Sequence, residues 1–232
     1  MSGPLRSEVV AVGAVDERLR AQMLALMQLV YEGVDERAFH RDLADKDECI
    51  LLWTPAGRLV GFSTQKVVHV ELQGQRVEGL FSGDTVVHPD HWGSPDLFQA
   101  FARRYVVEEP SRWWFLVSKG HRTYRMMTLF FSDFYPDRRR PTPAWEQQVM
   151  DAYASQLFGA EHDAARGVLA YRAPKDRLRP EYVRREQTAR HPDAVHFERL
   201  NPGYVEGHDL VCLARLSPSN LRPALRARLL GP

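Results

Sequence analysis

Two long strand-like stretches separated by a short polar turn constrain the fold of this chain more than any other feature. Residues 59–72 begin as a continuous apolar run and then alternate, residues 77–87 return, and the turn 73–75 lies between them. This pattern predicts a long antiparallel hairpin. Because proline has no N–H for the ladder, Pro89 predicts that the second strand ends at His88.

Helical and strand patterns alternate on both sides of this hairpin. Asp16 stands where an N-cap is expected, and apolar residues then recur at helical spacing as far as Val30. Ser94 followed by Pro95 predicts the start of another helix. The other predicted elements are buried strands at 49–53, 113–117 and 209–214, a helix after Gly120 reaching Phe134, and helices at 144–158, 180–190 and 220–230. The sequence thus predicts an α/β fold in one domain, residues 1–232.

Composition and charge narrow the classes of partner. The chain has 31 Lys and Arg against 30 Asp and Glu, which gives no general attraction to nucleic acid or membrane. No stretch approaches the roughly 20 apolar residues of a membrane helix, and none near the start has signal-peptide character. Cys49 and Cys212 lie in apolar runs and are read as buried thiols. We expect a cytoplasmic protein, without a metal, since His88 and His91 have no evident third ligand.

The order of elements and the segment at residues 86–97 carry a resemblance to a known family. This segment reads Val-Val-His-Pro-Asp-His-Trp-Gly-Ser-Pro-Asp-Leu, a strand exit followed by a glycine-containing loop and a helix start. It resembles the GNAT N-acyltransferase superfamily over residues 9–136, and again over 209–216, with an insertion or cap at about 137–206. The resemblance implies a GNAT-like splayed, mixed and mostly antiparallel sheet flanked by helices, with a helical C-terminal elaboration.

The resemblance also implies a donor site at the same loop. In the family, backbone N–H groups of the loop and the positive end of the helix dipole hold the donor pyrophosphate. Gly93 is present here, but the usual basic residue and second glycine are not. Pro95 lacks an amide donor, and Asp90 and Asp96 add negative charge. Three alternatives remain open: a weaker grip on the pyrophosphate, a donor on a carrier protein, or an inactive relative.

The residues implied to contact an acetyl-CoA or other acyl-CoA donor lie on the two parting strands, the loop and the following helix start. Lys119 and Arg122 belong to a small basic cluster that would offset the missing basic residue of the loop. The full implied set is Val86, Val87, His91, Trp92, Gly93, Ser94, Ser118, Lys119 and Arg122.

Candidate catalytic residues come from a polar interruption of the second long strand, Ser82 to Thr85. One interpretation is a β-bulge at Gly83 with Asp84 facing solvent. The other makes Asp84 a base for an amine, with Glu78 on the same face because an even spacing separates them. Where the family often has a tyrosine as general acid, the nearest substitute is Tyr124.

The predicted function is transfer of an acyl group from a CoA-type or carrier-protein thioester to the amine of a small molecule. The alternative is a non-catalytic GNAT-like module that binds a ligand or a partner. An acyl carrier protein and a second copy of this chain are further candidate partners, whereas nucleic acid and membrane are not expected.

Overall fold

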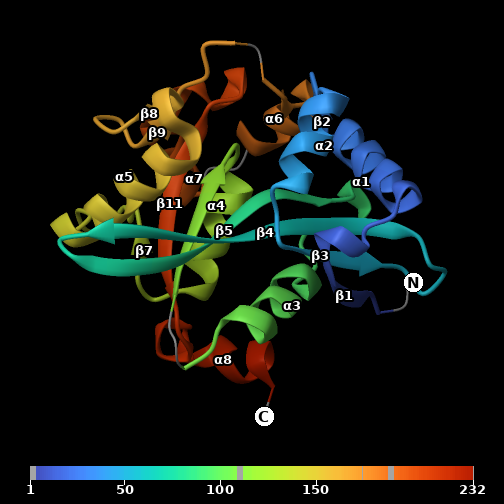
Figure 1. Cartoon of the computed structure of the whole chain (residues 1–232), viewed down its shortest axis with the longest axis horizontal. Helices are drawn as coiled ribbons and strands as arrows, with labels where there is room; N and C mark the ends of the chain where they lie inside the picture. Colours follow the sequence, from blue (N-terminus) through green and yellow to red (C-terminus); the bar gives the residue numbers. More distant parts are fainter. Residues whose placement is uncertain (1–3, 109–111, 174, 188–190, 232) are drawn as a thin grey trace.

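A computed structural model describes residues 4–108, 112–173, 175–187 and 191–231 (Figure 1). One large sheet forms the centre, with strand order β1-β3-β4-β5-β6-β11-β9-β8 and with β7 paired to β11. All its pairings are antiparallel except that of β5 with β6. The strands are β1 (Arg6–Ala11), β3 (Glu48–Trp53), β4 (Leu59–Leu72), β5 (Gln75–Val87), β6 (Arg112–Ser118), β7 (Phe134–Tyr135), β8 (His162–Asp163), β9 (Val168–Leu169) and β11 (Asp209–Leu216).

Helices cover both faces of the sheet, α1 and α2 above it and α3 and α8 below it in Figure 1. The first face, which carries Phe62, Val68 and Phe81, packs against α1 (Glu17–Val30), α2 (Glu36–Ala44) and α5 (Ala144–Phe158). The second face, which carries Leu80 and Trp114, packs against α3 (Asp96–Tyr105), α4 (His121–Phe130), α7 (Pro192–Leu200) and α8 (Pro223–Leu230).

A small second ribbon joins the segment after α1 to the C-terminal elaboration. It pairs β2 (Tyr31–Glu32), which follows α1, with β10 (Arg177–Leu178), which precedes α6 (Pro180–Gln187). Short 3-10 turns lie at Val12–Ala14, Pro89–His91, Gly159–Glu161, Pro202–Glu206 and Pro218–Asn220. The ribbon brings the C-terminal elaboration next to the connection between α1 and α2.

An aspartate side chain caps the start of α1, as predicted, and another caps the start of α2. The Asp16 carboxylate accepts from the Leu19 N–H at 2.7 Å, and the Asp35 carboxylate accepts from the Ala38 N–H at 2.6 Å. Each satisfies an N–H that has no partner inside its helix. At α3 the predicted start is one residue early, because Pro95 takes the cap position and the helix begins at Asp96.

The helix predicted to reach Phe134 is shorter than expected. It ends at Phe130, and Phe134 instead enters β7, whose partner is β11. Cross-strand pairing thus overrides a helical spacing of aromatic residues. The short β1 and the helix α7 were not predicted. The last three residues of the helix expected at 180–190 lie outside the described residues.

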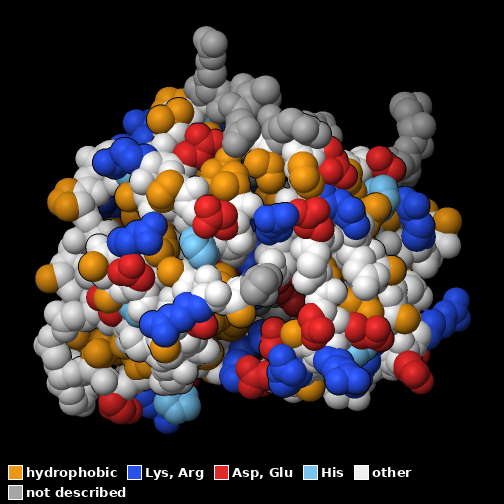
Figure 2. Space-filling view, turned by 90° about the horizontal axis from the view of Figure 1, so that it is seen from above, with side chains coloured by type: hydrophobic (Ala, Val, Ile, Leu, Met, Phe, Trp, Pro, Cys, Tyr) orange, Lys and Arg blue, Asp and Glu red, His pale blue; other side chains and the backbone are white. Residues whose placement is uncertain are grey.

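Other expectations concern cysteines and membranes. Cys49 and Cys212 are both buried free thiols, as predicted. Across the ranges given above, no helix has the length and apolar character needed to cross a membrane. Figure 2 shows acidic and basic side chains interspersed over the upper face of the molecule.

Candidate functional site

The two parallel strands at the centre of the sheet pair over only part of their length. β5 and β6 are in register from Gly79 opposite Trp113 to Ser82 opposite Leu116. Beyond that point β5 runs on to Val87 without pairing with β6, which itself ends at Ser118. The strands therefore part just where the polar segment of β5 begins.

A cavity of about 700 Å³ lies where the strands part. Its walls include β5 from Ser82 to Val87, Leu116 and Val117 of β6, the loop before α3 and the start of α4. Apolar side chains of α3 and α4 line one end, and those of α1 and α2 line another. The helices α3 and α4 start close after the two parting strands, which is the arrangement that the family resemblance implied. The predicted mixed, mostly antiparallel sheet flanked by helices, with a gap between two central strands, is therefore present.

The comparisons with known proteins found similar solved structures only. No family model and no curated protein matches the chain. A similar solved structure is that of a probable N-acyltransferase from Enterococcus faecalis, at 13% identity and TM-score 0.42, over 57% of this chain and 33% of that one. Another is an Escherichia coli GNAT family N-acetyltransferase in complex with CoA, at 12% identity and TM-score 0.38, over 56% and 71% of the two chains.

A third similar structure is Saccharomyces cerevisiae N-myristoyltransferase with bound myristoyl-CoA. It matches at 11% identity and TM-score 0.39, over 51% of this chain and 30% of that one. The chain thus spans about a third of the length of the Enterococcus and yeast proteins. At these identities, the substrates of this protein must be inferred from its own residues.

A β-bulge explains the polar interruption of β5. Ser63 of β4 lies opposite Thr85, but Gln65 lies opposite Ser82, so two residues of β5 face the single residue Thr64. The extra residue makes Gly83 necessary, because a Cβ there would lie 2.7 Å from the Thr64 hydroxyl. The predicted bulge is therefore present.

A chain of hydrogen bonds uses the other polar side chains around this bulge. The Trp114 indole N–H donates to the Ser82 hydroxyl at 2.8 Å, which donates to the Gln65 carbonyl oxygen at 2.6 Å. The Gln65 amide donates to the Ser63 hydroxyl at 2.7 Å, and that hydroxyl lies 2.8 Å from the Thr85 hydroxyl. Ser82 and Thr85 thus both point to the second face of the sheet.

Asp84 points to the opposite face from this chain of bonds. Ser82 and Thr85 share one face although they are three residues apart, so Asp84, next to Thr85, faces α1 and α2. Its partly buried carboxylate lines the cavity and has no hydrogen bond or ion pair with any residue in the described ranges. Burial, with a contribution from the Asp176 carboxylate and against the attraction of Lys46, raises the pKa of Asp84 to about 6.

Glu78 does not join Asp84. Glu78 and Ser82 are four positions apart along β5, so Glu78 lies on the Ser82 face, and the bulge places Asp84 on the other. The Glu78 carboxylate is paired with the Arg112 guanidinium and does not line the cavity. The expectation that the two acids share one face is wrong because strict alternation does not survive a bulge.

Tyr124 and Ser118 also lie outside the cavity lining. The Tyr124 ring is fully buried, its hydroxyl donates to the Pro136 carbonyl at 2.8 Å, and burial raises the pKa of this phenol. The buried Ser118 hydroxyl donates to the Gly120 carbonyl at 2.8 Å. The Ser118 hydroxyl therefore holds the backbone before α4, and the Tyr124 hydroxyl holds the backbone after β7, so neither faces the cavity.

Lys119 lies in the cavity wall but is already held by acids. Its ammonium is 3.2 Å from Asp209 and 3.6 Å from Asp176. Burial lowers the pKa of Lys119, but the two carboxylates more than offset this and raise it. The Tyr171 hydroxyl also donates to Asp209 at 2.7 Å. Sequence reasoning missed Asp176 and Asp209, because no local pattern reveals that distant segments meet at the end of β6.

The loop before α3 uses most of its own amides. The N–H groups of His91, Trp92 and Ser94 donate to carbonyls three residues earlier, and the Asp96 N–H donates to the Ser94 hydroxyl. That hydroxyl in turn donates to the Asp96 carboxylate, which lies at the start of the helix. Pro95 has no N–H at all. A phosphate approaching this helix would meet a carboxylate together with few available donors.

Trp92 and Arg122 form the polar rim of the cavity near that loop. The Trp92 indole N–H donates to the Val87 carbonyl at 2.7 Å, and the Arg122 guanidinium lies 3.8 Å from the centre of the indole ring. Tyr182 of α6 meets the same ring edge-on at 4.8 Å. Val86, Val87, His91, Trp92, Gly93, Ser94 and Arg122 all line the cavity.

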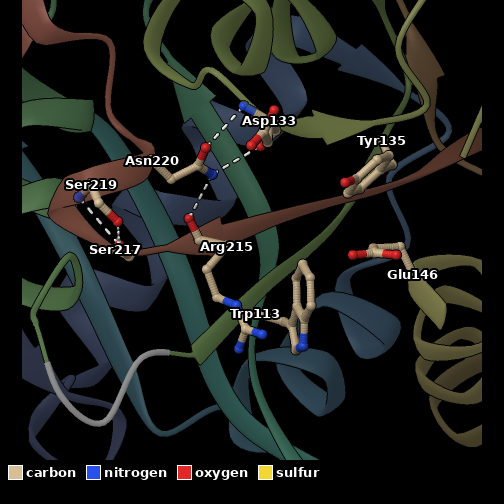
Figure 3. Close-up of a pocket in the computed structure, with 8 residues that line it drawn as sticks. All are labelled: Trp113, Asp133, Tyr135, Glu146, Arg215, Ser217, Ser219 and Asn220. Carbon is tan, nitrogen blue, oxygen red and sulfur yellow. Dashed lines mark hydrogen bonds between the residues drawn. The ribbon is translucent and has the colours of Figure 1, made fainter. Parts of the chain in front are cut away.

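A second hollow of about 280 Å³ lies near the other end of β6 and β11 (Figure 3). Several of its polar side chains form hydrogen bonds within the protein. The Asn220 side chain accepts from the Asp133 N–H at 2.9 Å and donates to the Asp133 and Arg215 carbonyls. Arg215 lies over the Trp113 ring at 4.0 Å. This hollow therefore marks where the turn after β11 is tied to the start of β7.

Proposed function

We propose that this protein transfers an acyl group from a CoA-type thioester to the amine of a small molecule. The observation that supports it best is Asp84, whose carboxylate has no partner in the described chain and lines the cavity between the parted strands. Burial raises the pKa of this carboxylate to about 6, so the group is ionised at neutral pH and its pKa lies close to that pH. A general base is most effective when its pKa lies near the working pH.

The proposed step is direct attack. Asp84 accepts a proton from the substrate ammonium, and the neutral nitrogen attacks the thioester carbonyl carbon. The new C–N bond forms as the C–S bond breaks, and the leaving thiolate takes up the second proton that the nitrogen loses as it becomes an amide. An N–H pointing into the gap would stabilise the oxygen as charge develops on it.

Val87 offers that N–H. The His88 N–H donates to the Val60 carbonyl of β4 at 2.7 Å, so the N–H of the preceding residue, Val87, points away from β4 toward the gap. By the same alternation the N–H of Val86 points to β4. Of these two amides, only that of Val87 is therefore proposed to polarise the carbonyl.

The donor end of the proposed site is the rim formed by Trp92 and Arg122. A guanidinium stacked on an indole is a positive charge held in place, which suits an anionic arm. His91 and Gly93 line the same end of the cavity. We assign donor contacts to these four residues, and none to Ser118.

Asp84→Asn tests the proposal. The variant should lower kcat/KM by about 10²–10⁴, the usual contribution of a general base. Thiol release from an acyl-CoA in the presence of amines measures this, and calorimetry should give unchanged donor binding. Glu71→Gln, at an exposed position of β4, is the matched control. An undiminished rate in Asp84→Asn would remove Asp84 from the mechanism.

The closed loop before α3 favours a second candidate function. Because Asp96 lies at the helix start and the loop amides are engaged, a donor carried on the phosphopantetheine arm of a carrier protein fits as well as free CoA. Calorimetry that compares an acyl-CoA with the matching acyl-pantetheine separates the two. Equal affinities would favour the carrier-bound donor. Binding without thiol release for any amine would favour a non-catalytic module.

A further inference from the structure

Buried acceptor atoms without donors gather at one end of the cavity. Asp84, Asp176 and Asp209 all line it. One oxygen of Asp209, a residue that is only 1% exposed, is buried and receives no hydrogen bond. One buried oxygen of Asp176 also receives no hydrogen bond, although it lies 3.6 Å from the Lys119 ammonium. Buried carboxylate oxygens are normally satisfied, so unsatisfied ones that line a cavity point to a donor that a ligand would bring.

The charges that line the cavity also do not balance. The charged side chains that line the cavity are six carboxylates and four cations, an excess of two negative charges: Asp35, Asp42, Asp45, Asp84, Asp176 and Asp209 against Lys46, Lys119, Arg122 and Lys175. Of the cations, Lys119 lies between Asp176 and Asp209, and Lys175 lies over the Tyr171 ring at 4.1 Å. The Lys46 ammonium is itself bound to the Asp42 carbonyl at 2.7 Å. Uncompensated charge in a partly desolvated site is costly, and a cationic ligand would offset it.

An apolar wall stands on the same face of the sheet. Phe81 precedes Ser82 and so points to the face that carries Asp84. Phe158, at the end of α5, meets the Phe81 ring edge-on at 5.7 Å. Both rings line the cavity together with Leu157. Hydrophobic surface next to a group of carboxylates suits a molecule with a cationic head and an apolar body.

We propose that the acceptor is an amphipathic primary amine, a conclusion that rests on the proposed function and names its substrate class. Its ammonium lies between Asp84 and Asp176, where its three N–H donors meet carboxylate oxygens. Its aryl or alkyl body packs against Phe81 and Phe158. A small hydrophilic amine would contact only the carboxylates. A neutral alcohol with the same apolar body would contact only the two rings.

Calorimetry on the full chain without donor tests the site separately from catalysis. At pH 7.5, 2-phenylethylamine should bind at least ten times more tightly than ethylamine, 2-phenylethanol or spermidine. Asp176→Asn should weaken 2-phenylethylamine at least tenfold and leave 2-phenylethanol unchanged, with Glu71→Gln as control. Equal affinity for ethylamine or spermidine, or an unaffected Asp176→Asn variant, would overturn the proposal.

The apolar wall has its own pair of variants. Phe158→Ala should reduce the preference for 2-phenylethylamine over ethylamine and leave ethylamine binding unchanged, whereas Val195→Ala, at a position that is 58% exposed, should alter neither. A preference retained in Phe158→Ala would refute the role of the wall. Thiol release then separates the two proposals. Selective binding without acylation sinks the proposed function but leaves the amine site, and acylation of hydrophilic amines alone does the reverse.

Discussion

Asp84→Asn removes one negative charge from the cavity wall and nearly preserves the shape of the side chain. In the folded chain, burial and the neighbouring Asp176 raise the pKa of Asp84 from 3.8 to about 6. The folded state therefore holds a proton that the unfolded state has already lost between about pH 4 and pH 6. Stability contributed at this site falls as pH rises through that interval, because the folded state binds more protons there.

The magnitude follows from the size of the shift. About two pKa units at about 1.4 kcal/mol each give an upper limit of about 3 kcal/mol, and solvent in the cavity reduces it. The Asn variant does not carry this cost. Its free energy of unfolding should equal that of the wild type near pH 4 and exceed it by about 1–3 kcal/mol above pH 7. For a chain of this size, Tm rises by roughly 2–4 °C per kcal/mol.

Thermal and urea unfolding of both proteins from pH 4 to pH 8 measure the difference, with Glu71→Gln as the control at an exposed site. Wild-type turnover should rise through about pH 6 as Asp84 ionises, and then level off. An Asp84→Asn variant no more stable than wild type at pH 8, or a difference independent of pH, would refute the claim that this carboxylate is desolvated. A site that loses rate and gains stability on the same change is typical of a functional residue.

Three further changes probe the surroundings of Asp84. Gly83→Ala places a Cβ within 2.7 Å of the Thr64 hydroxyl, so urea unfolding should show a loss of about 1–3 kcal/mol and kcat should fall with the displaced bulge. Tyr124→Phe should cost about 0.5–1.5 kcal/mol of stability for its lost hydrogen bond and leave turnover unchanged; a large drop in kcat would restore this phenol as the acid. Trp92→Phe frees the Val87 carbonyl and should raise the donor KM about fivefold, the equivalent of about 1 kcal/mol, whereas an unchanged KM would separate this rim from donor binding.

Much of the fold was readable from local pattern. The long hairpin, the N-cap at Asp16 and the helix over residues 144–158 depend on periodicity and turn chemistry that a few neighbouring residues supply. The prediction that Phe131 and Phe134 belong to a helix was wrong, because it rested on local spacing alone. The strand partner of Phe134, β11, begins more than 70 residues later, and no local window contains it.

Some residues of the candidate site could likewise be predicted from the sequence, and others only from the structure. The polar interruption of β5 made Asp84 a candidate base, and the family resemblance implied a donor site at the loop from His91 to Ser94; both segments line the cavity. The sequence therefore determined which strand is interrupted and with which side chains. Only the tertiary structure decided that the bulge separates Asp84 from Glu78, that Tyr124 is locked in the core, and that Asp176 and Asp209 meet Lys119. Strand register and long-range contact depend on which segments pair, and a local pattern does not contain that information.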